Sequence, residues 1–161
     1  MSKNVKNAAG KSDKYDALLL DNQLCFPFYV CAKEIVNRYT PFLNKIGLTY
    51  TQYITMMVMW EEKEVVSRHL KERLFLDSGT LTPVINKLAQ KGLITKERSK
   101  EDQRDLIVKI TDKGEALKEE AINVPARVAM CFGGDVNGAM ELKRLLNEMM
   151  ELFKNGCANN K

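Results

Sequence analysis

The sequence predicts a mainly α-helical fold that carries one small β-hairpin. In the stretch from Asp77 to Thr111, apolar residues recur first at the spacing of a helix and then at the spacing of strands. Both ends of the chain also carry long stretches in which apolar residues recur every three or four positions. The expected architecture is therefore a helix–hairpin unit flanked by long amphipathic helices.

A helix is predicted from about Ser78 to Lys91. Asp77 and Ser78 are residue types that cap helix N-termini, and Pro83 falls in the first turn, where its missing N–H costs little. Lys91 and Gly92 supply a basic last turn and a glycine stop. The apolar stripe of this helix consists of Leu81, Val84, Ile85 and Leu88.

Two strands are predicted next, over residues 93–96 and 106–110, joined by a highly charged tip over residues 99–105. A helix with a polar face followed by such a hairpin is the winged helix-turn-helix arrangement, in which the helix enters the major groove of DNA. The alternative is a helix–hairpin unit that packs and binds nothing. The polar face favours DNA binding, because phosphates and base edges need hydroxyl, amide and ammonium groups. Its residues are Ser78, Thr80, Thr82, Asn86, Lys87 and Gln90.

The N-terminal part of the chain begins with a polar segment, residues 1–15, that is predicted to be disordered. A long helix is predicted over residues 16–43. Pro27 lies inside it and removes one helical hydrogen bond, so we expect a kink or a break near residues 24–27, at Cys25. The apolar positions of this helix are Leu19, Leu20, Leu24, Phe28, Cys31, Ile35, Tyr39 and Phe42.

The segment before the predicted DNA-binding helix contains two further helices. Thr49 is a cap for a helix over residues 50–62. Residues 63–74 are predicted to form the first helix of the helix-turn-helix, with residues 75–76 as the turn. The winged helix-turn-helix is thus expected to cover about residues 50–111.

Two more helices follow the hairpin. The first starts after Thr111, contains Pro125 in its interior and ends at Gly133. The second runs from about residue 136 to 153, and residues 154–161 form a flexible tail. Because the winged core has too little surface to bury all the apolar stripes, we expect a two-fold dimer. The predicted dimerisation helices, from both ends of the chain, cover about residues 16–43 and 112–153.

Length, charge and cysteine pattern narrow the class of protein. The 161 residues fit one domain, expected over residues 16–153, and the net charge of +4 suits a polyanion partner. We find no apolar run of membrane-spanning length and no signal peptide, so a cytoplasmic protein is expected, with no membrane partner. The four cysteines lack CxxC spacing and there is one histidine. We therefore predict free thiols, no metal site and no cofactor.

The order of these elements resembles the MarR family of dimeric transcriptional regulators. DSGTLTP and GLITKERSKEDQRD look like its recognition helix and wing, and residues 18–53, LLLDNQLCFPFYVCAKEIVNRYTPFLNKIGLTYTQY, are similar to the OhrR branch of organic-hydroperoxide sensors. The resemblance implies a homodimer that binds double-stranded operator DNA. The candidate DNA-binding residues are Asp77, Ser78, Thr80, Thr82, Asn86, Lys87, Lys100, Asp102 and Arg104.

The candidate sensing residue is Cys25. A thiolate attacks peroxides, and Tyr29 lies one helical turn further on, so that its hydroxyl can hydrogen-bond the sulfur. By resemblance, Tyr39 and Tyr50 reach the same sulfur from the partner subunit, which makes the site a product of the dimer. The alternative is that Cys25 is a small buried hydrophobe. The combination of the LCF segment with the three tyrosines favours sensing.

A second thiol enters through the same resemblance. In some relatives a low-molecular-weight thiol captures the oxidised cysteine, and in others a distal cysteine forms an intersubunit disulfide with it. Cys131 lies near the place expected for such a resolving cysteine, whereas Cys31 and Cys157 receive no role.

The sequence therefore leads to three functional hypotheses. The first is a repressor that releases DNA when organic hydroperoxides oxidise Cys25. The second is a MarR-type regulator released by a lipophilic or phenolic ligand, with Cys25 only lining its pocket. The third is a thiol peroxidase. The wing argues against an enzyme, as does the absence of machinery that would recycle an oxidised thiol.

Overall fold

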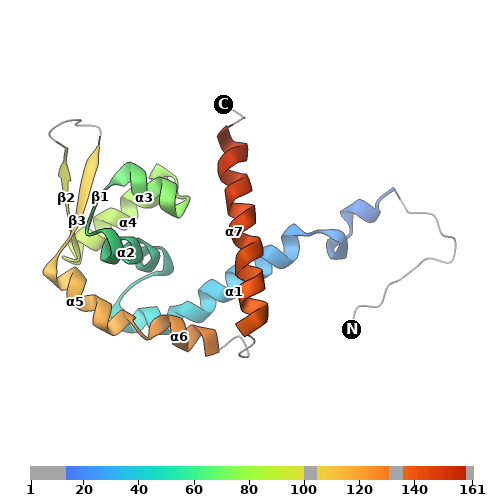
Figure 1. The fold of residues 1–161 in the computed structure, drawn as a ribbon, viewed down its shortest axis with the longest axis horizontal. Coiled ribbons are helices and arrows are strands. Elements are labelled where there is room, and N and C mark those ends of the chain that lie inside the picture. The colour runs from blue at the N-terminus through green and yellow to red at the C-terminus, as the bar shows by residue number, and fades with distance from the viewer. Residues whose placement is uncertain (1–13, 100–104, 131–135, 159–161) are drawn as a thin grey trace.

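The computed structural model describes residues 14–99, 105–130 and 136–158 (Figure 1). The chain is mainly helical, with a three-stranded antiparallel sheet, so the predicted fold class is confirmed. In chain order the elements are the 3-10 turns Asp16–Leu18 and Leu20–Asn22, α1 Cys25–Leu43, the 3-10 turn Asn44–Ile46, α2 Tyr50–Glu62, β1 Glu64–Val66, α3 Ser67–Leu74, α4 Ser78–Gln90, β2 Ile94–Arg98, β3 Leu106–Ile110, α5 Asp112–Ala121, α6 Val124–Ala129 and α7 Val136–Ala158.

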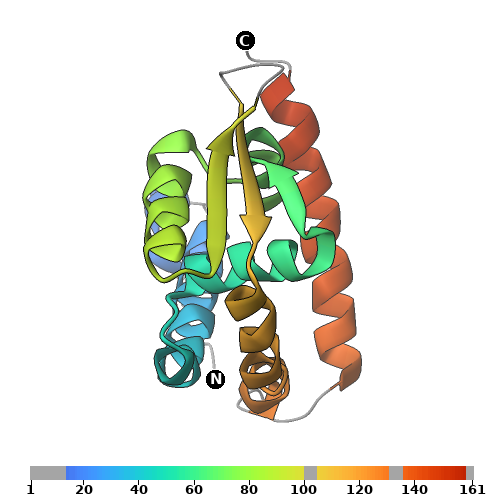
Figure 2. The ribbon, with the colours of Figure 1, turned by 90° about the vertical axis from the view of Figure 1, so that its left-hand side faces the viewer.

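The hydrophobic core lies where α2, α3, α4 and the sheet meet the C-terminal end of α1 and the helices α5 and α6. Figure 2 shows the three strands side by side, with β3 in the middle. Among the described residues, every buried side chain falls between Leu43 and Val128. The side chains with the least exposure are Leu43, Met56, Met59, Leu70, Leu81, Ile85, Leu88, Ile94, Val108 and Thr55.

The predicted helix over residues 63–74 is only partly correct. Lys63 has a positive φ of 65°, which ends α2, and Glu64–Val66 then forms the strand β1. This strand pairs with β3 and places Val65 opposite Val108, both of them buried. Pairing satisfies the backbone groups and suits two adjacent β-branched valines, so strand wins over helix here.

The predicted helix caps at both ends of α4 are present. The Asp77 carboxylate accepts the Thr80 backbone N–H at 2.8 Å, and Gly92 adopts a left-handed φ of 71° directly after the helix. Thr49 begins α2 with a capping box in which Gln52 is the reciprocal partner. These caps fix both ends of α4 and the start of α2.

Proline positions explain the other differences from the predicted elements. α1 begins at Cys25, so the break expected near residues 24–27 is present and Pro27 lies in the first turn of the helix. Residues 16–22 form short 3-10 turns instead of a continuous helix. After the sheet, the single helix predicted with Pro125 in its interior is two helices, and Pro125 sits in the first turn of α6. A proline in the first turn of a helix loses no helical hydrogen bond. Each of these two helices therefore begins one or two residues before its proline.

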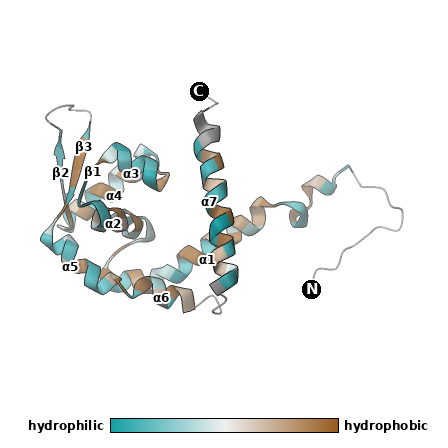
Figure 3. Ribbon diagram, in the orientation of Figure 1, coloured by the Kyte–Doolittle hydropathy of each residue, from teal (hydrophilic) through white to brown (hydrophobic). Residues whose placement is uncertain are grey.

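The two ends of the chain extend away from the core. Figure 1 shows the N-terminal half of α1 reaching outwards and most of α7 standing apart from α2 and α4. Near the C-terminal end of α7, the Lys154 Nζ atom lies 5.7 Å from the centroid of the Phe75 ring, directly after α3. α7 continues past residue 153 to Ala158, so that the predicted tail is helical up to that residue. Figure 3 shows hydrophobic residues along both of these helices. Within the described ranges, no helix is long and apolar enough to cross a membrane.

Candidate functional site

The helix α4, which is the predicted recognition helix, presents a polar face to solvent. Ser78, Thr82 and Lys87 are exposed, and Asn86 is half-buried because its side-chain oxygen accepts a hydrogen bond from Lys96 on β2. The helix is held on the core by its apolar stripe, which is buried. An exposed polar face on a firmly packed helix is what insertion into a DNA groove requires.

Two predicted DNA-binding residues are engaged within α4 itself. The Asp77 carboxylate caps the helix, and the Thr80 hydroxyl donates to its second oxygen at 3.0 Å. The backbone N–H and hydroxyl of Thr80 both stabilise the charged form, so they lower the pKa of Asp77. Asp77 is thus ionised at neutral pH and positions the first turn of the helix.

The base of the wing is fixed to α3. The Ser99 backbone N–H donates to the Asp105 carbonyl at 2.9 Å and closes the hairpin, while the Asp105 carboxylate pairs with the Arg68 guanidinium at 3.0 Å. Sequence reasoning missed Arg68, because its contact depends on how α3 packs beside β3. Lys100, Asp102 and Arg104, at the predicted tip, lie outside the described residues.

Two other basic residues, one on the sheet and one on α3, are paired with acidic side chains. Lys109 lies between Glu64 and Glu97 of the neighbouring strands, at 3.3 Å and 3.0 Å, and these hydrogen bonds raise the pKa of Lys109. Arg73 on α3 pairs with Glu61 and Glu62 of α2. These pairs brace the sheet and the helix-turn-helix.

The candidate sensing thiol lies at the exposed start of α1. Cys25 is the first residue of that helix and is exposed, and Tyr29, four residues later, is 63% exposed. Their spacing places both on one face of the helix. Tyr39 lies further along the same helix, about 21 Å from Cys25 at 1.5 Å per residue.

The two other predicted tyrosines meet each other at the edge of the core. The Tyr39 and Tyr50 rings are in edge-to-face contact with centroids 5.1 Å apart, and Tyr53 lies 6.0 Å from Tyr39. Burial raises the pKa of Tyr39 and of Tyr50, so both phenols keep their protons at neutral pH and can act as donors. Within one chain, this pair is too far from Cys25 to contact its sulfur.

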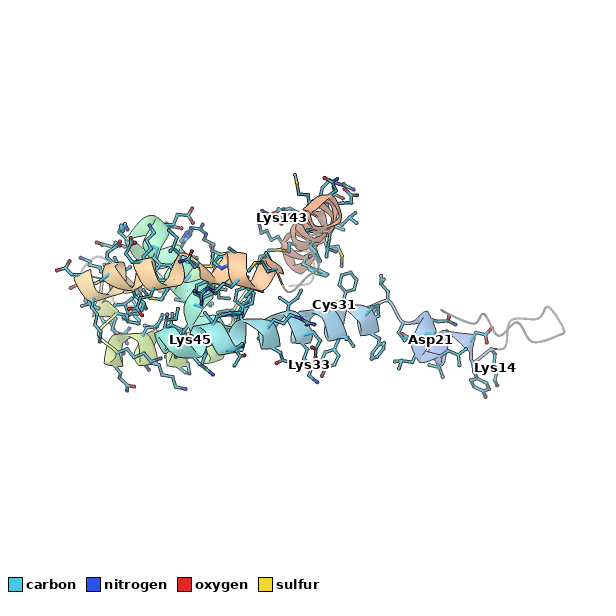
Figure 4. All side chains as sticks on the ribbon, turned by 90° about the horizontal axis from the view of Figure 1, so that it is seen from below. Lys14, Asp21, Cys31, Lys33, Lys45 and Lys143 are labelled. Atoms are coloured by element: carbon cyan, nitrogen blue, oxygen red, sulfur yellow. The ribbon has the colours of Figure 1, made fainter. Side chains whose placement is uncertain are left out.

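The remaining cysteines differ in their surroundings. Figure 4 labels Cys31 on α1, and Cys31 lines an apolar pocket of about 300 Å³ between α1 and α7. A six-residue separation on a helix puts Cys31 on a different face from Cys25. Cys131 lies outside the described residues, and Cys157 belongs to α7. In the described parts of the chain, no group of three His, Cys, Asp or Glu side chains could hold a metal ion.

Comparison with known proteins assigns the family. The family described as "Transcriptional regulator SarA/Rot" matches residues 37–121. The "Organic hydroperoxide resistance transcriptional regulator" of Bacillus subtilis is 37% identical over 142 residues, which are 88% of this chain and 95% of that protein. The chain belongs to the MarR/SarA family of winged helix-turn-helix transcriptional regulators. It is a DNA-binding regulator and, as the sequence predicts, not an enzyme.

Other MarR/SarA-family members are similar in sequence and in fold. The "HTH-type transcriptional regulator SarZ" of Staphylococcus saprophyticus is 41% identical over 81% of this chain and 90% of its own length. AbfR of Staphylococcus epidermidis, in a structure described as reduced and bound to DNA, matches with a TM-score of 0.75 and 30% identity, covering 89% of this chain and 98% of AbfR. AbfR structures described as overoxidized and bound to DNA, and as disulfide-formed, match with TM-scores of 0.63 and 0.57.

Proposed function

We propose that this protein is a dimeric, redox-sensing repressor that binds operator DNA while Cys25 is reduced and releases it when an organic hydroperoxide oxidises Cys25. The observation that carries the proposal is the exposed thiol of Cys25 beside the exposed Tyr29, at the start of a helix with unpaired apolar residues. A sensing thiol must be reachable by its oxidant and must have donors nearby that favour the thiolate. Tyr29 meets the second requirement from the same helix.

The sensing site is completed by a second subunit. Because Tyr39 lies about 21 Å along α1 from Cys25 of its own chain, and Tyr50 packs against Tyr39, we propose that the two tyrosines donate to a sensing sulfur across a dimer interface. Exposed apolar side chains on α1 and α7 supply the surface for that interface, since patches of this kind mark association sites in proteins. They include Phe26, Tyr29, Val30, Met140, Leu142, Leu145, Leu146, Met150, Leu152 and Phe153, and Leu24 directly before α1 adds to them.

The chemistry proceeds in two steps. The Cys25 thiolate attacks one peroxide oxygen, so that an S–O bond forms, the O–O bond breaks and the alkoxide leaves as an alcohol after taking a proton. A second thiolate then attacks the sulfur of the sulfenic acid, so that an S–S bond forms, the S–O bond breaks and the hydroxide leaves as water after taking a proton. The second thiol is either Cys131 of the partner subunit or a low-molecular-weight thiol.

The second step is the one that we link to DNA release. AbfR has been described both as overoxidized and bound to DNA and as disulfide-formed. The overoxidized form of that relative is therefore compatible with DNA binding. By analogy, we propose that a disulfide on Cys25 shifts the helices, because it must draw together groups from different elements. The spacing of the two recognition helices then no longer matches successive major grooves.

DNA recognition follows the polar face of α4. We propose that Ser78, Thr80 and Lys87 contact the major groove together with Thr82 and Asn86, and that Arg104 contacts the minor groove or its phosphates, with Lys100 and Asp102 beside it at the wing tip. Asp77 contributes through the cap that holds the first turn in place. The pair between Arg68 and Asp105 sets the direction of the wing.

A second candidate function is release by a lipophilic ligand. The pocket of about 300 Å³ between α1 and α7 favours it, because its lining is apolar and its size lies at the lower end for small-molecule sites. Its lining residues are Leu24, Pro27, Phe28, Cys31, Ala32, Ile35, Leu142 and Leu146. In this alternative, Cys25 has no reactive role.

Operator binding under controlled redox conditions tests the proposal. Wild-type protein should bind operator DNA when reduced, lose it on treatment with cumene hydroperoxide, and regain it after a dithiol reductant. Cys25→Ser should bind and ignore the peroxide, and Cys31→Ser, the matched control on the same helix, should respond as wild type does. Peroxide release of Cys25→Ser to the same extent as wild type contradicts the proposal and favours the ligand-released regulator.

The resolving thiol is tested in the same assay. Cys131→Ser should lose a reductant-sensitive covalent dimer if Cys131 is the resolving residue, and its Cys25 should progress to sulfinic acid on prolonged exposure. Wild-type behaviour of Cys131→Ser would assign resolution to a small thiol. Mass spectrometry of the oxidised proteins distinguishes the two outcomes.

A further inference from the structure

The C-terminal end of the recognition helix lies at a junction of four elements. The sequence gives Lys91 only the role of a basic residue in the last turn of a helix. In the structure its side chain contacts Gly47, which follows the 3-10 turn after α1, and the start of α2, while its carbonyl accepts a hydrogen bond from α5. The residues of this Lys91 junction are Gly47, Gln52, Lys91, Gly92, Thr111 and Lys113.

The first half of the Lys91 junction connects α4 to α1. The Lys91 Nζ atom donates to the Gly47 carbonyl oxygen at 2.5 Å and to Gln52 Oε1 at 2.8 Å. Gly47 is joined firmly to α1, because the Leu48 backbone N–H donates to the Leu43 carbonyl at 3.0 Å across the turn. A displacement of the C-terminal end of α1 therefore moves the acceptor that holds Lys91.

Gln52 is an anchored partner in this contact. Its side chain is part of a residue that is only 3% exposed, and the same Oε1 atom also accepts the Thr49 backbone N–H at 3.2 Å. Much of Lys91 is exposed, yet burial, followed by the positive charge of Lys87, lowers the pKa of Lys91. Hydrogen bonds from a charged donor are about twice as strong as neutral ones, so the contact is costly to break.

The second half of the Lys91 junction connects α4 to α5. The Lys113 Nζ atom donates to the Lys91 carbonyl at 2.7 Å, and the Thr111 hydroxyl donates to the Gly92 carbonyl at 2.7 Å. Thr111 is also the N-cap of α5 and accepts the Gly114 backbone N–H at 3.1 Å. The last turn of α4 is thus bonded to the helices on both sides of it.

We infer that Lys91 is a positioning residue that couples the thiol-bearing helix α1 to the recognition helix α4. This inference rests on the proposed redox function. Oxidation at Cys25 displaces α1, the Gly47 carbonyl moves with it, and the Lys91 ammonium transfers that displacement to the end of α4. Lys91 touches neither the thiol nor DNA in this role.

Lys91→Met tests the coupling, because methionine keeps an unbranched apolar stem and removes both side-chain hydrogen bonds. We measure operator Kd for the reduced and the oxidised protein, together with the rate of Cys25 oxidation by cumene hydroperoxide. Allosteric couplings are typically about 5–150-fold. The ratio of oxidised to reduced Kd should be at least about threefold smaller in Lys91→Met than in wild type, which is a modest part of a typical allosteric coupling. The rate of Cys25 oxidation should be unchanged.

Two further variants separate coupling from simple stability or charge. Lys91→Arg keeps a cationic donor of similar reach and should restore most of the wild-type ratio. Lys45→Met removes the same charge from the exposed 3-10 turn before Gly47 and should keep the wild-type ratio. A merely structural lysine would lower reduced and oxidised affinities equally, and that result overturns the inference.

The outcomes distinguish this inference from the proposed function. If wild type is released by oxidation and Lys91→Met is released equally, the inference is wrong and the proposed function stands. If wild type itself keeps its operator after Cys25 is oxidised to a disulfide, the proposed function is wrong, and the coupling role falls with it.

Discussion

Leu88 on α4 and Leu146 on α7 both belong to the apolar stripe of an amphipathic helix, yet Leu88 is fully buried and Leu146 is 36% exposed. The same contrast separates the DNA-binding core, residues 43–128, from the two arms, residues 14–42 and 136–158. In the core, the stripes of the helices close on one another and on the sheet. In the arms, large apolar side chains stay uncovered. An apolar stripe in the sequence thus predicts that one face of a helix will be buried. It does not tell whether the same chain or a second chain covers that face.

The largest expected effect is the loss of the dimer through one substitution in an arm. Leu146→Glu places a charge where we propose that the partner packs, and a buried charge without a partner costs several kcal/mol. The protein should sediment as a monomer at micromolar concentration. Operator affinity should fall by about 100-fold or more, because two linked half-sites gain about 10²–10⁴ in avidity.

The control for Leu146→Glu is Arg144→Gln. Arg144 lies two residues away on the same helix, on the opposite side, where it forms exposed ion pairs with Glu141 and Glu148. Such pairs contribute little, so this variant should remain dimeric. If Leu146→Glu stays dimeric, the proposal that the arms form the dimerisation surface is wrong.

In the DNA-binding core, Gly114→Ala should produce the next largest effect. A methyl group at this buried position would overlap the Leu93 carbonyl oxygen, and the Gly114 carbonyl accepts the Trp60 indole N–H at 2.7 Å. Overpacking of this kind costs about 1–3 kcal/mol. Urea unfolding at fixed protein concentration measures the loss. Gly79→Ala is the comparison variant and should cost less, since its new methyl group meets no backbone atom outside its own helix, only the Asp77 carboxylate oxygen at 3.0 Å.

An effect of similar size, on DNA affinity and not on stability, is expected at the wing. Arg104→Ala should weaken operator binding by about 1–3 kcal/mol, because a charge-assisted contact with DNA is lost. Arg68→Met should weaken it less, since it frees the base of the wing without removing a proposed DNA contact. Fluorescence anisotropy at several salt concentrations distinguishes the two variants, because only Arg104→Ala should reduce the salt dependence of operator binding. Wild-type affinity for Arg104→Ala would contradict the wing assignment.

The smallest effect concerns the pH dependence of stability at the start of α4. Hydrogen bonds from Thr80 lower the pKa of Asp77 in the folded protein. The cap therefore contributes fully above the ordinary carboxyl pKa of about 4, and its contribution is lost as pH falls through the lowered folded value. Thermal unfolding can be measured from about pH 2 to 7, a range that brackets the carboxyl pKa. As the pH falls, the stability of Asp77→Ala should decrease less steeply than that of wild type. Parallel curves for the two proteins would remove the proposed linkage.

Local chemistry explains which parts of the fold were predictable. Thr49, Asp77 and Thr111 cap helices through groups that lie within three residues of them, so residue type and position suffice. The strand β1 escaped prediction because its three residues become a strand only by pairing with β3, more than forty positions later. Breaks in α5–α6 depend on where a proline can occupy a first turn, which the apolar spacing alone does not decide.

The candidate site divides in the same way. Helical spacing alone relates Cys25 to Tyr29, and the contact of Tyr39 with Tyr50 joins two helices that are neighbours in the chain. The assignment of this tyrosine pair to a partner's sulfur came from family resemblance and stays a prediction. Lys91 and Arg68 could not be selected from sequence, because a lysine or arginine at a helix end has many solvent-exposed alternatives and only the tertiary packing supplies their acceptors.

The indole of Trp60 gives this molecule a built-in optical signal. The sequence has one tryptophan, so the emission comes from a single place, where Trp60 is 8% exposed and bonded to the first turn of α5. Its ring lies 6.2 Å from that of Tyr53, which contacts Tyr39 in turn. Excitation of these tyrosines should pass efficiently to the indole. A movement of α5 that opens the indole to water would shift the emission to longer wavelength, which allows the switch to be timed in a stopped-flow instrument without any attached dye.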